Sequence, residues 1–311
     1  MKEYTIENEY IRLGVLDYGL RIKEIFIKSL NRNVVLKYHR NEEYLSDENY
    51  FGASIGPNAN RIEDGRFSIG NRIYQWDINN GKNNLHSGKF GFDKKLWDIV
   101  VKNDVLTASL SNQEPFLTDV KVTITLSGYR IDISYEANSK RACILNMTNH
   151  TYFNLSSEAN VLNHKVKLHS SSYTPLNENQ LPTGNILCVK ATAFNLDGNL
   201  KLWELFNRYE EELKVFSGYD HNFIIDGIGM RSFADIEVED LALNISSDAK
   251  CAQFYTGNFI RIDKEPMPYL GLCIEPQYAP NSMNIQAFDQ PRFKENEKYL
   301  LNISYLFSLR A

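Results

Sequence analysis

The chain has 311 residues, of which 43% are hydrophobic, and this is typical of a globular protein with a large core. Its net charge is -5, and because it has no block of basic residues we expect neither nucleic acid nor a membrane surface as a partner. No secretion signal or apolar span of membrane length is visible, and the four cysteines are isolated from one another, so we expect a cytoplasmic protein without disulfides or a metal site.

Alternation of apolar and polar residues, the pattern of a half-buried β-strand, dominates the chain. In chain order it occurs at 11–15, 106–110, 120–126, 129–135, 241–245 and 301–307. Ser127-Gly128 separates two of these runs, and Gly70-Asn71 separates 67–69 from 73–74, so hairpins are predicted at both places. The only predicted helix is a short one at 201–206.

These elements predict an all-β fold, a large antiparallel β-sandwich with few short helices. Strands do not alternate with helices, and the sequence contains neither GxGxxG nor GxxxxGK[ST], so a parallel nucleotide-binding sheet is not expected. Composition does not shift along the chain, and no long linker interrupts it. We therefore expect a single domain over 1–311.

Two polar segments in the first third of the chain contain candidate binding residues. Arg61 follows a stretch rich in glycine and asparagine, and the simpler interpretation is a turn that leaves Arg61 exposed. His86 lies in Asn-Asn-Leu-His-Ser-Gly, and an isolated histidine is more often structural than catalytic.

His150 and Glu275 are the strongest candidates for chemistry. His150 lies in Asn-Met-Thr-Asn-His-Thr-Tyr-Phe-Asn, a run that we expect to be a strand with Thr148, His150 and Tyr152 on one face. A histidine among so many polar groups is also compatible with a satisfied core residue. Glu275 lies in Leu-Cys-Ile-Glu-Pro-Gln, where a carboxylate is seldom buried without a partner or a task. Together they would form an acid/base pair that needs neither nucleophile nor metal.

Asp220 and several aromatic residues complete the candidates. Asp220 precedes a predicted strand, where it would either cap a turn or accept hydrogen bonds from a vicinal diol. Aromatic side chains that line a cleft stack on sugar rings, and the candidates for this role are Trp97, Tyr152, Phe254 and Tyr255.

Taken in order along nearly the whole chain, these segments resemble the aldose 1-epimerase (galactose mutarotase) family. The resemblance rests on Asn-Arg-Ile at 60–62, Leu-His-Ser-Gly at 85–88, Thr-Asn-His-Thr-Tyr-Phe-Asn-Leu at 148–155, Tyr-Asp-His at 219–221 and Glu-Pro-Gln at 275–277. It implies a β-supersandwich and interconversion of the α and β anomers of a free aldose such as galactose or glucose. No cofactor is implied.

The matching motifs also imply a role for each residue. His150 would be the general acid and Glu275 the general base. The sugar would be bound by Asn60, Arg61, His86, Tyr152, Asp220 and Gln277. The expected partner is a small monosaccharide, and the protein is expected to be a monomer or a homodimer. With these roles the rate should follow a bell-shaped pH profile, with Glu275 setting the acid limb and His150 the alkaline limb unless the two couple strongly.

Other functions stay open at this point. A related enzyme acting on a phosphorylated or modified sugar would need a cluster of Arg or Lys at the pocket mouth. A carbohydrate-binding protein without catalysis would not need both His150 and Glu275. A glycoside hydrolase is less expected, because those enzymes usually use two carboxylates.

Overall fold

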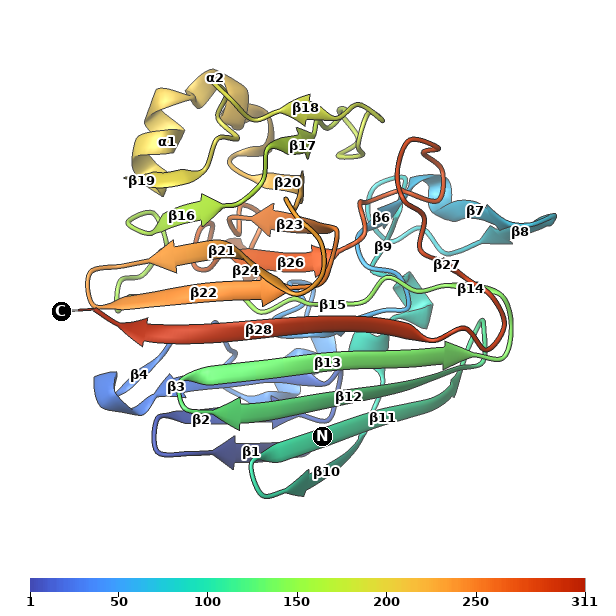
Figure 1. The fold of residues 1–311 in the computed structure, drawn as a ribbon, viewed down its shortest axis with the longest axis horizontal. Coiled ribbons are helices and arrows are strands. Elements are labelled where there is room, and N and C mark those ends of the chain that lie inside the picture. Colours follow the sequence, from blue (N-terminus) through green and yellow to red (C-terminus); the bar gives the residue numbers. More distant parts are fainter. Residues whose placement is uncertain (311) are drawn as a thin grey trace.

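The computed structural model describes residues 1–310, so the last residue of the predicted 1–311 domain lies outside it. Every pair of strands in its sheets is antiparallel, and the helices are few and short. The prediction of an all-β antiparallel fold is therefore confirmed (Figure 1).

The largest sheet has nine strands and forms one layer of the molecule. Their order is β10-β11-β12-β13-β28-β22-β21-β16-β19. The bounds are β10 (Asp98–Lys102), β11 (Val105–Gln113), β12 (Thr118–Ser127), β13 (Arg130–Ser139), β16 (Lys165–Leu168), β19 (Asp197–Lys201), β21 (Arg231–Glu237), β22 (Leu241–Ser247) and β28 (Tyr299–Leu309). The predicted hairpin at Gly128 joins β12 to β13, with Ser127 opposite Arg130.

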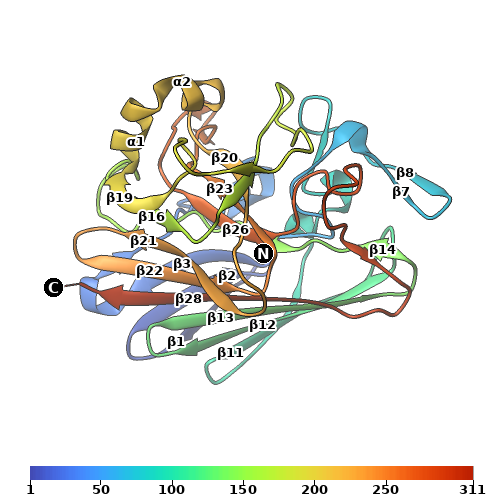
Figure 2. The same cartoon turned by 45° about the horizontal axis from the view of Figure 1, so that its top comes forward.

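Two smaller sheets face the inner side of this layer (Figure 2). The N-terminal sheet has four strands, β1 (Glu3–Glu7), β2 (Ile11–Leu16), β3 (Arg21–Ile27) and β4 (Arg32–Asn33). The other has five strands in the order β18-β17-β20-β23-β26. Its strands are β17 (Ser172–Thr174), β18 (Leu187–Cys188), β20 (Asp220–Ile224), β23 (Cys251–Tyr255) and β26 (Cys273–Gln277).

Short two-stranded ladders tie the long loops together. They pair β5 (Ser54–Ile55) with β15 (Thr148–Asn149), β6 (Arg61–Ile62) with β9 (Asn84–Leu85), and β7 (Arg66–Ile69) with β8 (Arg72–Gln75), the last being the hairpin predicted at Gly70. They also pair β14 (Cys143–Ile144) with β27 (Arg292–Phe293), and β24 (Arg261–Ile262) with β25 (Glu265–Pro266).

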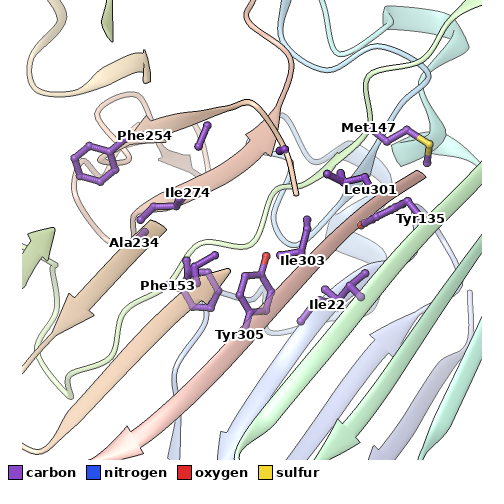
Figure 3. Packing of buried hydrophobic residues seen from close by; sticks show 14 of the residues in the cluster. Ile22, Tyr135, Met147, Phe153, Ala234, Phe254, Ile274, Leu301, Ile303 and Tyr305 are labelled. Atoms are coloured by element: carbon purple, nitrogen blue, oxygen red, sulfur yellow. The ribbon is translucent and has the colours of Figure 1, made fainter. Parts of the chain in front are cut away.

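The hydrophobic core lies between the sheets. Ile22 of β3, Ile303 and Tyr305 of β28, and Ile274 of β26 belong to one buried cluster, so all three main sheets share it (Figure 3). Period-two alternation explains this arrangement, because every second residue of each strand faces the same side.

The two α-helices lie together in one corner of the molecule (Figure 1), while short 3-10 helices occur at η1 (Lys28–Leu30), η2 (Asn41–Ser46), η3 (Glu63–Gly65), η4 (Gly88–Phe90), η5 (Phe92–Lys94) and η6 (Lys214–Phe216). The predicted helix at 201–206 is α1 (Leu202–Arg208), and α2 (Glu210–Leu213), which was not predicted, follows it directly. Within residues 1–310 no helix combines the length and apolar character that a membrane crossing would require.

Candidate active site

One face of the five-stranded sheet is polar and forms the floor of a small cavity. The register aligns Asp220 with Tyr255 and Gln253 with Glu275, so these four side chains share a face. The intervening residues, Phe254 and Ile274 among them, belong to the hydrophobic core on the other face. Period-two alternation therefore places catalytic candidates and core on opposite sides of the same strands.

The cavity has a volume of about 140 Å³ and lies where loops from the other sheets meet this face. Ligand pockets for drug-sized molecules are larger, about 300–1,000 Å³, so this one suits a small polar molecule. Of the eight residues to which the family motifs give a role, seven line it: Asn60, Arg61, His86, His150, Tyr152, Asp220 and Glu275.

His150 lies in an extended segment that is not the full strand predicted from the sequence. Only Thr148 and Asn149 form β15, which pairs with Ile55 and Ser54 of β5. The backbone is still fixed at His150, whose N–H donates to the carbonyl of Ala53 and whose carbonyl accepts from Gly52. His150 and Tyr152 do face the same cavity, as the alternation predicted.

Strand β26 presents a side chain to each ring nitrogen of His150. Glu275 Oε1 lies 3.7 Å from Nε2, and the Cys273 thiol lies 3.4 Å from Nδ1. The distance to Glu275 is too long for a direct hydrogen bond, so ring and carboxyl flank a common space. Cys273 and Glu275 are two residues apart in the strand and therefore share a face.

Burial favours the neutral form of both members of this pair. It lowers the pKa of His150 to about 4 and raises the pKa of Glu275 well above its usual range, where the negative charge of Asp220 adds to the effect and Arg61 opposes it. In the free protein the lower of the two pKa values therefore belongs to His150 and the higher to Glu275. This reverses the limbs that the sequence led us to expect for the pH profile.

His86 is held as a hydrogen-bond donor toward the cavity. The backbone N–H of Asn60 donates to its Nδ1 at 3.2 Å, so the proton of the neutral ring lies on Nε2. Burial lowers the pKa of His86 well below 6.5, with the neighbouring His150 and Arg61 adding to the effect, and the ring is therefore neutral at pH 7.

Arg61 is buried, contrary to the interpretation of an exposed turn, with 7% of its surface exposed. The ladder between β6 and β9 sets it beside Leu85 and so beside His86. Its Nη1 lies 3.4 Å from Asp220 Oδ2, and Gln253 donates to the other oxygen of Asp220 at 2.7 Å. Asp220 is thus the first residue of a strand and not a turn cap, and both of its oxygens have partners.

Several residues around the cavity adopt left-handed backbone conformations although they are not glycines. Tyr50, Asn60 and His86 have φ values of 61°, 64° and 51°. Such conformations cost of order 1 kcal/mol each and cluster at functional sites. All three of these residues line the cavity.

Aromatic rings pack around the two histidines. Tyr152 stacks on His150 with ring centroids 4.9 Å apart, and its hydroxyl donates to the carbonyl of Asn49. Tyr50, which was not predicted, contacts both histidine rings. The prediction that Trp97 and Phe254 stack on a sugar is wrong, because both side chains are buried in the hydrophobic core.

Gln277 is the predicted binding residue that does not line the cavity. It lies two residues beyond Glu275, about 7 Å further along the strand, and is paired with Cys251. Sequence reasoning also missed Asn80 and Gln253, which hold Arg61 and Asp220. No local signal marks them, because each acts through a partner that is distant in the sequence.

A family model described as Aldose 1-epimerase matches residues 2–306. The chain belongs to the aldose 1-epimerase family. Within it, the chain is 31% identical to human galactose mutarotase over 99% of this chain and 94% of that protein. It is 33% identical to the aldose 1-epimerase of Escherichia coli over 86% of this chain and 82% of that protein.

The family fold is also found in solved structures. A crystal structure of an aldose epimerase homologue from C. elegans matches with a TM-score of 0.92, covering 100% of this chain and 99% of that one. At 23% identity this likeness concerns the fold alone. Among residues 1–310 no three His, Cys, Asp or Glu side chains are grouped so that they could hold a metal ion.

Proposed function

We propose that the chain interconverts the α and β anomers of a free aldose of the galactose or glucose type. The observation that carries this proposal is the pair formed by His150 Nε2 and Glu275 Oε1, 3.7 Å apart in a buried cavity. Membership of the aldose 1-epimerase family supports the same reaction.

The reaction needs one proton taken and one proton given. Glu275, as carboxylate, takes the proton from the anomeric hydroxyl, and the C1–O5 bond breaks as the C1=O1 double bond forms. His150, as imidazolium, gives its Nε2 proton to O5. After rotation about C1–C2, O5 attacks the other face of the aldehyde and both protons return. Each group is worth roughly 10²–10⁴-fold in rate.

The pair holds a single proton throughout this cycle. With the ring closed, Glu275 is ionised and His150 is protonated, and with the ring open both are neutral. Burial stabilises the neutral pair, since it raises the pKa of Glu275 and lowers that of His150. The low-dielectric site therefore favours the state that accompanies the open-chain sugar, which is the intermediate that must be reached.

The remaining residues would bind and orient the sugar. His86 offers an Nε2–H donor, while Arg61 and Asp220 offer a donor and an acceptor that are already fixed relative to each other. Tyr152 presents an aromatic wall. Asn60 would act mainly through its backbone, which sets the tautomer of His86.

The charge around the cavity disfavours a phosphorylated substrate. Arg61 is the one Arg or Lys among its lining residues, and it lies within 3.4 Å of Asp220. A phosphate group is usually bound by several cationic groups or backbone N–H groups. A monosaccharide remains the expected partner, and a cytoplasmic monomer or homodimer remains the prediction from the sequence.

Polarimetry of freshly dissolved α-D-glucose and α-D-galactose tests the proposal. With the protein present, we expect faster decay to the same equilibrium rotation. No acceleration of either sugar by a folded sample would contradict the proposed function. The corresponding 6-phosphates, run in parallel, should be poorer substrates.

A further inference from the structure

The Arg61 guanidinium is held by acceptors from three separate parts of the chain. Besides Asp220, its Nε donates to Asn80 Oδ1 at 3.0 Å, and its Nη2 donates to the amide oxygen of Gln180. Asn80 lines the cavity, whereas Gln180 does not. Gln180 therefore reaches the site only through Arg61.

Gln180 belongs to a tight turn, residues 176–182, that leads from β17 toward β18. The side chain of Asn177 accepts hydrogen bonds from two backbone N–H groups of the turn, at 2.9 and 3.2 Å. Gln180 has a left-handed backbone with φ 58°, as do residues that line the cavity. A glutamine in this conformation is unfavourable, so the tertiary contacts hold it there.

The 176–182 turn is also docked on the segment that precedes His86. The side-chain amide of Asn83 donates to the carbonyl of Asn179 at 3.1 Å. Asn83 is paired with Asn80, the second neutral acceptor of Arg61. The turn and the segment before His86 are thus joined, and together they bring the amide oxygens of Gln180 and Asn80 to the guanidinium of Arg61.

We propose that Gln180 is a positioning residue: its amide oxygen fixes the direction of the Arg61 guanidinium without neutralising its charge. The inference rests on the proposed function, in which Arg61 binds the sugar. A neutral acceptor suits this role, because a carboxylate at the same place would offset the cation that faces Asp220 and Glu275.

The charge of Arg61 matters because Glu275 has few groups that favour its ionised form. The titratable groups whose charges interact with it are Arg61, His150, Tyr152, Asp220, Cys273 and Tyr305. Of these, Arg61 lowers the pKa of Glu275 and Asp220 raises it. A second carboxylate on Arg61 would raise the pKa of Glu275 and of His150 together.

Three variants separate positioning from folding. Gln180→Met keeps the bulk of the side chain but removes the acceptor. Gln180→Glu keeps the acceptor and adds a charge. Glu178→Ala, an exposed residue of the same turn, is the matched control, and thermal melting should give similar midpoints for all three.

Sugar affinity is measured by calorimetry with D-galactose and D-glucose, and turnover by polarimetry. We expect Gln180→Met to weaken binding about tenfold, with kcat within about threefold of wild type, and Glu178→Ala to change neither. Gln180→Glu should bind sugar more tightly than Gln180→Met, because the acceptor is present again. It should also raise both apparent pKa values of the pH profile by about half a pH unit.

Two results would overturn the inference: sugar affinity of Gln180→Met equal to that of Glu178→Ala, or a pH profile of Gln180→Glu that coincides with wild type. The binding measurement does not depend on turnover. A wild-type protein that binds sugar without accelerating mutarotation would contradict the proposed function, and the affinity of Gln180→Met would still decide the role of Gln180.

Discussion

At the scale of single residues, the site combines ordinary side chains in an unusual electrostatic setting. His150 and Glu275 are both buried, and no Arg or Lys side chain forms an ion pair with Glu275 within residues 1–310. The second partner of His150 is a thiol, which burial keeps protonated by raising its pKa. The imidazolium of His150 is a stronger acid beside a neutral thiol than it would be beside a carboxylate, which would stabilise its positive charge. A stronger acid is better suited to protonate the ring oxygen of the sugar, which is only weakly basic.

This setting predicts the pH dependence of kcat/KM. As the pH falls toward about 4, His150 gains a proton while Glu275 is already protonated, so the pair loses its base and activity declines. At high pH, above the raised pKa of Glu275, the pair loses its last proton and with it the acid. The two apparent pKa values of this profile belong to the coupled pair and not to either residue alone.

Polarimetric rates between about pH 4 and 9, corrected for the uncatalysed reaction at each pH, check this expectation. An acid limb centred near 6.5, the ordinary pKa of histidine, would contradict the account, because it would mean that His150 is not desolvated in the free protein.

At the scale of elements, the strands explain how distant residues meet. One face of β20, β23 and β26 carries the polar site, and the other carries core residues. The site is therefore only as rigid as the core beneath it. Strand β28 is central to that core, since it pairs with both β13 and β22 and carries Ile303 and Tyr305 into the cluster shown in Figure 3.

Shortening a core side chain of β28 should therefore destabilise the protein strongly. Ile303 is 1% exposed, and Ile303→Ala should lower the free energy of unfolding by about 2–4 kcal/mol, because it removes buried apolar surface and leaves a cavity. The midpoint of chemical denaturation at an unchanged m value measures this loss.

Leu300, on the same strand but 51% exposed, provides the control. Leu300→Ala should change the stability by about 0.5 kcal/mol or less. Equal losses for the two variants would mean that the assignment of inward and outward faces along β28 is wrong.

At the scale of the whole molecule, the sequence predicted the class of fold and most of the cavity, but not the contacts that arrange it. The alternating runs became β2, β11, β12, β13, β22 and β28, because period two directly reports which face is buried. Seven of the eight binding and catalytic candidates line one cavity. Gln277 does not, since proximity in a strand does not imply proximity to a ligand.

The residues that the sequence did not reveal act through long-range partners. Gln180 lies 119 positions from Arg61, and Gln253 lies 33 positions from Asp220. Glutamine and asparagine are common and carry no periodic signal, so the roles of Gln180, in a turn, and of Gln253, in β23, appear only when the strands and loops are placed together. The same holds for the burial of Arg61, which depends on loops from several sheets.

The measurement that tests the central claim most directly is the polarimetric rate of α-D-galactose mutarotation by Glu275→Gln, compared with wild type. The substitution keeps the shape of the side chain and removes the base, so we predict a rate at least about 100-fold lower, with sugar binding and folding retained. A rate within about threefold of wild type would contradict the account, because Glu275 could not then be the group that takes the anomeric proton.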